Sequence, residues 1–132
     1  MYSMSNAAAQ YKRINNEGAI EGASPHNLIL MLMNGGLERL VQARSAMERG
    51  DTALKGSLIG KAISIISGLQ ASLERGQAPE LVDNLERLYD YMQRRLLEAN
   101  IKNDPAMLDE VNDLLRTVKS AWIEIDPARK SA

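Results

Sequence analysis

Apolar residues recur along this chain at the spacing of α-helices, and four long segments carry that pattern. The first begins at a Ser-Pro pair at 24–25, which supplies an N-cap residue followed by proline at the first helical position. Gly50 follows the last apolar repeat of this segment and predicts its end. Asp51 or Thr52 can then cap a second helix.

Glycine, proline and capping residues also mark the ends of the helices in the rest of the chain. The second helix is predicted to run to Gly76, and Pro79 opens a third that ends near Asn100. An Asp-Pro pair at 104–105 opens a fourth, which stops before Pro127. Because short loops join these long helices, consecutive helices should be antiparallel. The predicted fold is therefore all-α, an antiparallel up-and-down four-helix bundle.

The N-terminal segment has a weaker pattern. Ala7, Tyr11 and Ile14 share one face for about three turns at 3.6 residues per turn, and residues 15–22 break the pattern. We expect an additional short, weakly anchored N-terminal helix here. The predicted organisation is a single domain over residues 1–132. Within it, residues 1–23 form a mobile N-terminal segment and residues 24–126 form the bundle.

The first long helix has more apolar surface than one core face requires. Its main stripe contains Ile29, Leu32 and Met33, but Leu30, Leu37 and Val41 form a second stripe about 100° away. The third and fourth helices each have a single apolar stripe, which includes Leu81 in the third and Trp122 and Ile125 in the fourth.

The second helix combines an apolar half with a half made of small residues. No charged residue lies between Lys61 and Glu74. Three glycines inside the helix cost roughly 1 kcal/mol each relative to alanine, so close approach by another element would compensate for them. The small residues on this side are Ala53, Gly56, Gly60, Ser64, Ser67 and Ala71.

The sequence alone leaves two interpretations of the extra apolar surface on the first and second helices open. The first and second helices can be central helices contacted on several sides, or they can expose grooves for the amphipathic helices of a partner. The candidate contact residues are Ile29, Leu30, Met33, Leu37, Val41, Ile59, Ile63 and Ile66. An exposed groove needs a cover, and the N-terminal segment is the candidate plug through Tyr2, Met4, Tyr11 and Ile14.

Composition argues for a binding protein and against catalysis. The 132 residues contain no Cys, a single His and nearly balanced charges, with 16 basic and 17 acidic side chains. We therefore expect no nucleic-acid partner, no membrane insertion and a cytoplasmic location. His26 is predicted to be an exposed residue near a helix cap, and the acidic cluster at 109–113 a solvated face. No catalytic residue, cofactor or metal site is predicted.

Several blocks resemble, in order, the FliS family of flagellar export chaperones. They are Ala-Ser-Pro-His-Asn-Leu-Ile-Leu-Met-Leu at 23–32, Gly-Asp at 50–51, Lys-Ala-Ile-Ser-Ile-Ile at 61–66, the region around Leu-Tyr-Asp-Tyr-Met at 88–92, and Ala-Trp at 121–122. One departure concerns Met33-Asn34, where the family commonly has an aromatic and an acidic residue. A Met at this point of the groove would alter its size preference.

The resemblance implies a cytoplasmic chaperone that binds the disordered C-terminal region of flagellin. It would prevent premature polymerisation and deliver flagellin to the export gate of the flagellar type III apparatus. It also implies that the N-terminal segment can occupy a hydrophobic groove when flagellin is absent, which agrees with the plug. We expect a monomer when no client is bound. The alternative is a structural bundle that forms homodimers through the second stripe of the first helix, Leu30-Leu37-Val41.

Overall fold

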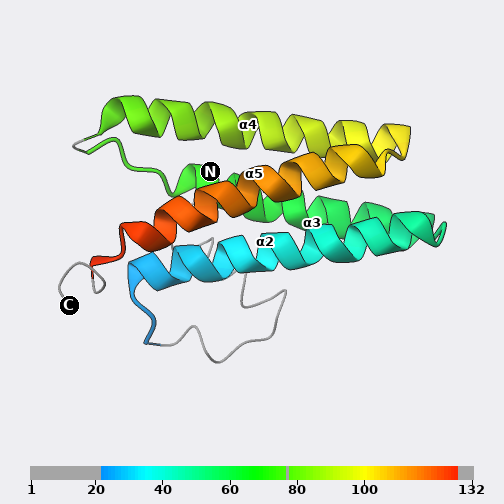
Figure 1. The fold of residues 1–132 in the computed structure, drawn as a ribbon, viewed down its shortest axis with the longest axis horizontal. Helices are drawn as coiled ribbons and strands as arrows, with labels where there is room; N and C mark the ends of the chain where they lie inside the picture. The colour runs from blue at the N-terminus through cyan, green and yellow to red at the C-terminus, as the bar shows by residue number, and fades with distance from the viewer. Residues whose placement is uncertain (1–21, 77, 128–132) are drawn as a thin grey trace.

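A computed structural model describes residues 22–76 and 78–127, and this part of the chain is helical (Figure 1). It confirms the predicted all-α bundle, with four helices and no strand among the described residues. The predicted N-terminal helix and plug fall on residues outside this part of the chain. The helices are α2 (Pro25–Glu48), α3 (Thr52–Ala71), α4 (Pro79–Lys102) and α5 (Pro105–Glu124).

Three of the helices begin with the caps that the sequence predicts. The side chain of Ser24 accepts a hydrogen bond from the backbone N–H of Asn27 at 3.1 Å. Asp51, rather than Thr52, caps α3, and Asp104 caps α5. These oxygens satisfy backbone donors that have no partner inside the helix.

The second helix ends earlier than predicted. It was expected to continue to Gly76, but α3 stops at Ala71. Ser72 is the C-cap, and its hydroxyl donates to the carbonyl oxygen of Leu69 at 2.7 Å. This side-chain bond competes with the continuing helical ladder, which accounts for the earlier end.

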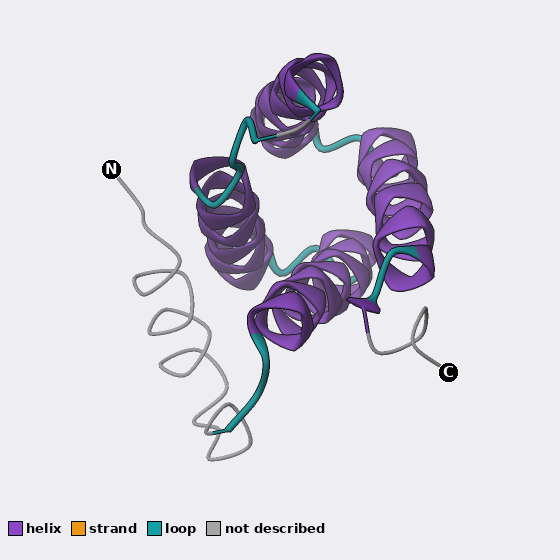
Figure 2. Ribbon diagram, turned by 90° about the vertical axis from the view of Figure 1, so that its left-hand side faces the viewer, coloured by secondary structure: helices purple, strands orange, loops and turns teal. Residues whose placement is uncertain are grey.

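The four helices form a ring when the bundle is viewed from its end (Figure 2). In this ring α2 packs against α3 and α5, and α4 packs against the same two helices from the other side. Each helix therefore directs one face toward the centre and two flanks toward its neighbours, and its remaining face points outward. This arrangement decides which of the apolar stripes can be buried.

The central face of every helix contributes large aliphatic side chains to the core. Ala43, Ala46 and Ala62 are also fully buried, which allows helices to approach closely at these points. The largest fully buried side chains are Leu32, Met33, Leu40, Ile59, Ile65, Ile66, Leu69, Met92, Leu96, Leu108, Val111 and Leu115.

Two residues of the predicted core stripes are exposed because they lie at helix ends. Leu81 is in the first turn of α4, and Ile125 is the C-cap of α5. Conversely, Tyr89 is buried on the central face of α4, where desolvation raises its pKa to about 12. The helical pattern thus predicts the middle of each stripe correctly and fails where neighbouring helices no longer cover it.

A buried lysine joins the start of α3 to the end of α4. Lys55 donates to the carbonyl oxygen of Asn100 at 3.1 Å and to the side-chain oxygen of Asn103 at 2.9 Å. Asn103 has the left-handed conformation of a helix C-cap, with φ of 52°. The ammonium group thus lies at the negative end of the α4 dipole, which compensates for its burial.

Gly60 and Gly36 test how helix propensity and packing combine in this bundle. A Cβ atom at Gly60 would have no neighbour within 4 Å, so we expect Gly60→Ala to raise the free energy of unfolding by about 1 kcal/mol. At Gly36 it would lie 3.2 Å from Cδ2 of the buried Leu115. We expect this crowding to cancel the helical gain in Gly36→Ala. Urea unfolding of both variants measures the difference, and equal stabilisation of the two would contradict the packing of α2 against α5.

Candidate functional site

The eight predicted contact residues divide between the core and the surface. Ile29, Met33, Ile59 and Ile66 are buried among the core side chains. Leu30, Leu37 and Ile63 are partly exposed, and Leu37 and Ile63 also pack against the core. Val41 is 63% exposed. Among these eight positions, only the last four present surface that a partner can contact in this conformation.

The outward side of α3 is a smooth surface made of small residues. The set predicted from the sequence, from Ala53 to Ala71, is partly or fully exposed. Gly60 has open space at its Cβ position, and Gly56 has only the side-chain nitrogen of Asn100 nearby, at 4.0 Å. This surface, which we name the α3 face, offers backbone that another helix can approach closely.

Exposed apolar side chains of α4 border the α3 face. Gln93 donates to the side chain of Gln70 on α3 at 2.8 Å, and Asn100 lies beside Gly56. Leu97 is one turn from both of these α4 residues, so it lies on the same flank of the helix. Leu97 and Ile101 are 54% and 83% exposed. Sequence reasoning missed both residues, although their i, i+4 spacing outside the core stripe was a usable signal.

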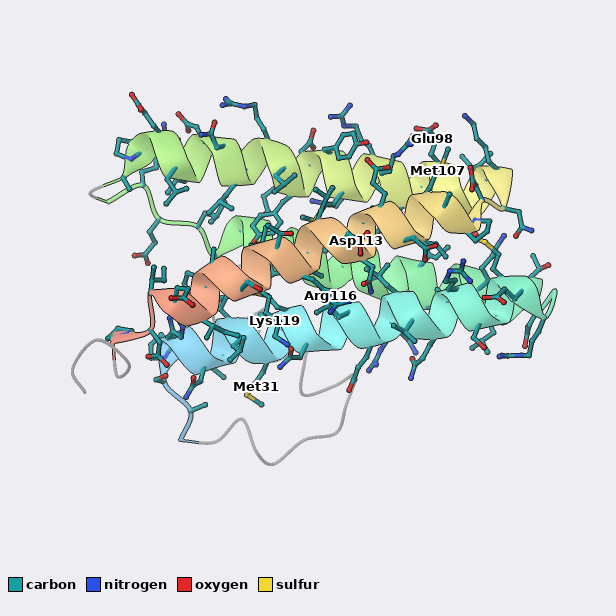
Figure 3. The ribbon with its side chains drawn as sticks, in the orientation of Figure 1. Met31, Glu98, Met107, Asp113, Arg116 and Lys119 are labelled. Atoms are coloured by element: carbon teal, nitrogen blue, oxygen red, sulfur yellow. The ribbon has the colours of Figure 1, made fainter. Side chains whose placement is uncertain are left out.

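The opposite border of the α3 face is formed by α2. Leu28 and Met31 are partly exposed, and the side chain of Met31 points away from the bundle (Figure 3). Met31 is flexible and polarizable, which suits a surface that has to adapt to another side chain. Apolar residues of α2 and α4 thus frame the small residues of α3 between them.

The groove between α3 and α4 is hollowed near both of its ends. At one end, beside the turn between α2 and α3, lies a hollow of about 360 Å³. Its lining includes the apolar Met47 and Ile101 and the polar side chains Asp51, Thr52, Lys55, Asn100 and Asn103. At the other end a hollow of about 350 Å³ is lined by Gln70 and by the charged side chains Asp83, Glu86, Arg87 and Asp90. Both ends of the groove therefore offer polar groups to a bound segment, and the apolar contact comes from the side chains on α2 and α4 that border the α3 face.

The predicted solvated acidic face at 109–113 is partly wrong, because two of its carboxylates form ion pairs between helices. Asp109 accepts from Nε of Arg44 on α2 at 2.6 Å. Glu110 accepts from Tyr91 at 2.5 Å and from Arg95 at 2.6 Å, both on α4. A single helix could not indicate these partners, since they depend on how α5 is aligned with its neighbours.

The expectation of an exposed His26 is also wrong. Its ring stacks on the indole of Trp122, with ring centroids 4.4 Å apart and an angle of 6° between the planes. The indole N–H donates to the carbonyl oxygen of His26 at 2.9 Å. His26 therefore joins the first turn of α2 to the last turn of α5.

Residues 22–76 and 78–127 contain no group of His, Asp and Glu side chains arranged to hold a metal ion. None of the four helices there is both long enough and apolar enough to cross a membrane. The features that stand out are surfaces, and these surfaces are suited to binding other helices.

Comparison with known proteins identifies one family. The model of the family described as flagellar protein FliS matches residues 6–129. The chain is 54% identical over 122 residues to the flagellar secretion chaperone FliSB of Pseudomonas aeruginosa, covering 92% of this chain and 96% of the relative. It is 45% identical over 128 residues to flagellar secretion chaperone FliS of Salmonella typhimurium, covering 96% and 94%. With the Vibrio cholerae protein of the same name the identity is 42% over 117 residues, covering 89% and 86%.

The Glu110 ion pair predicts a loss of stability in acid. Hydrogen bonds from Tyr91 and Arg95 lower the pKa of Glu110 below its ordinary value of 4.5. The stabilisation is therefore fully present above pH 4.5 and is lost as the pH falls through the lowered pKa. We expect Glu110→Gln to unfold more easily at neutral pH and to lose less stability than the wild type upon acidification.

Urea midpoints between about pH 6 and pH 3 measure this effect. The control is Asp113→Asn on the same helix, because the side chain of Asp113 forms no ion pair within the described residues. Parallel pH profiles for wild type and Glu110→Gln would show that this carboxylate does not contribute.

Proposed function

The chain belongs to the FliS family of flagellar proteins, and on this premise we propose that it binds the disordered C-terminal region of flagellin. Its role as a flagellar export chaperone follows from the family. In our proposal the bound chaperone prevents premature polymerisation in the cytoplasm and delivers flagellin to the type III export gate. It acts by binding alone, without catalysis or a cofactor.

The observation that carries the proposal is the uncharged α3 face. Glycines inside a helix lower its stability, yet no part of the described chain packs onto Gly60. Such a cost is compensated when a client helix approaches the backbone closely. The small residues also leave room for large apolar side chains of the client, and Leu97 and Ile101 supply apolar contact at the border.

The energetics of a disordered client require an extended apolar surface. Ordering a disordered segment costs roughly 2 to 5 kcal/mol or more of the gross interaction energy. The α3 face and its borders on α2 and α4 extend over most of the length of the bundle, so a client can repay this cost with several separate contacts. Of the predicted contact residues, we place Ile63 at this surface, whereas Ile59 and Ile66 support it from the core.

The border residue Leu97 provides a direct test with a matched control. We expect Leu97→Asp to weaken binding of a flagellin C-terminal peptide by about tenfold or more, because it places a charge in an apolar contact. Leu81→Asp is the control, since Leu81 is an equally exposed leucine in the first turn of the same helix, at 56% against 54%. Isothermal titration calorimetry measures the peptide affinity of each variant, and circular dichroism shows whether each variant is folded.

Gly60→Leu gives an independent view of the same surface, because it fills the α3 face without adding charge. A one-to-one complex in light scattering is expected for the wild type. Unchanged peptide affinity in both Leu97→Asp and Gly60→Leu would place the client elsewhere. A tight dimer that ignores the peptide would instead favour the structural bundle.

Deletion of residues 1–14 tests the plug. In the proposal, Tyr2, Met4, Tyr11 and Ile14 compete with flagellin for the groove that α2 and α3 flank, so their removal should raise peptide affinity. Binding of a dye specific for exposed apolar surface should rise as well. Replacing residues 1–14 with a Gly/Ser sequence of the same length separates competition from chain length. If the truncated protein and the wild type show the same affinity and dye binding, the segment is not a plug.

A further inference from the structure

A second apolar surface lies between α2 and α5, away from the α3 face. It consists of Leu30, Leu37 and Val41 on α2 and of Arg116 and Lys119 on α5, and we name it the α2–α5 face. Val41 is 63% exposed, and the two leucines are partly exposed. From Leu30 to Val41 the stripe is about 16 Å long at 1.5 Å per residue, which matches three turns of a partner helix.

The Val41 end of this face is hollowed. A groove of about 310 Å³ lies between the two helices, and its apolar walls come from Leu40 and Val41 on α2 and from Leu108 on α5. Ser45 and Asn112 supply uncharged polar groups at its edges, and the ion-paired Arg44, Glu48 and Asp109 complete its lining. The groove can therefore accept an apolar side chain next to the exposed Val41.

Charge along the face is divided unevenly. At one end Arg44 is neutralised, because it donates to both carboxylate oxygens of Asp109, at 2.6 and 3.1 Å, and pairs with Glu48. Arg116 and Lys119 pair with no carboxylate in the described part of the chain. Both side chains extend from α5 toward the α2 side (Figure 3). The apolar stripe therefore has one cationic border.

We propose that the α2–α5 face binds an amphipathic helix of a partner protein whose apolar stripe is bordered by acidic residues. Complementary charge specifies the partner and its orientation, because acidic side chains along one edge of the helix would meet Arg116 and Lys119. A second copy of this chain fits less well. A two-fold contact in which the two stripes run antiparallel would place the cationic borders of both copies against each other, where like charges repel.

This face differs from the one that we assign to flagellin. The α3 face is uncharged and made of small residues, whereas the α2–α5 face is bordered by cations and made of branched aliphatic residues. The described helices separate the two surfaces, since α3 and α5 are neighbours of α2 on different sides. A partner can thus occupy the α2–α5 face while flagellin occupies the other.

Two designed helical peptides test the inference. Both carry leucines at the i, i+3, i+7 spacing, and one has glutamates along the border of the stripe whereas the other has lysines. We expect the full-length chain to bind the glutamate peptide at least about tenfold more tightly than the lysine peptide at low salt, with the difference decreasing as salt is added.

Charge reversal on the chaperone completes the test. The double variant Arg116→Glu, Lys119→Glu should reverse the preference between the peptides, and Val41→Ser should weaken both. Arg94→Glu on α4 is the control, because it reverses an exposed cation on a helix that does not pack against α2, and it should leave both affinities unchanged. Circular dichroism confirms that each variant is folded.

Several results would overturn the proposal. These are equal binding of the two peptides, no binding of either, an unchanged preference after charge reversal, and a dimer in sedimentation equilibrium that Val41→Ser dissociates. A flagellin C-terminal peptide is titrated in parallel to distinguish the two proposals. If the charge reversal weakens flagellin binding, the face belongs to the client and not to another partner. If flagellin does not bind the wild type while the peptide preferences hold, the proposed client fails and this inference stands.

Discussion

A ring of four helices can bury only one face of each helix, and the rest of this structure depends on that constraint. In the ring each helix has two neighbours and a central face, so no helix is surrounded. One apolar stripe from each helix fills the core, and buried small residues such as Ala43 and Ala62 allow the helices to approach closely. Apolar surface beyond one stripe on α2, and small-residue surface beyond it on α3, must therefore remain at the outside of the bundle.

This constraint explains why stability and binding favour different residues on α3. Stability of the free protein favours alanine or a charged residue on an outward helical position, but α3 has Gly60 and a surface free of charge between Lys61 and Glu74. Ion pairs on other helices contribute to stability instead. Arg44 with Asp109 and Arg95 with Glu110 join α5 to α2 and to α4. The α3 face carries no comparable ion pair in the described residues, so a partner approaching it displaces none.

A structural feature could be predicted from the sequence when it depends on residues that are close together in the chain. Caps at Ser24, Asp51 and Asp104 depend on side chains within three residues, so the helix starts were predicted correctly. The division between core and surface was not predictable to the same degree. A helical wheel shows that α2 has two stripes, but only the positions of α3 and α5 decide that Met33 is buried while Val41 is exposed. Glu110 and His26 were misjudged for the same reason, since their partners come from other helices.

The separation of the two surfaces has a consequence for how binding events can influence one another. Between the α3 face and the α2–α5 face lies α2, whose buried residues Met33 and Leu40 contact the core while Leu37 packs against it from the surface. Because interiors are close-packed, a partner that shifts α2 toward α5 must also move its contacts with α3. The stacked His26 and Trp122 limit such a shift at one end of the bundle, since they fasten α2 to α5 by a hydrogen bond as well as by ring contact. Any coupling between the two surfaces would therefore be carried by the opposite half of α2, where the exposed Val41 and the hollow beside it leave room for movement.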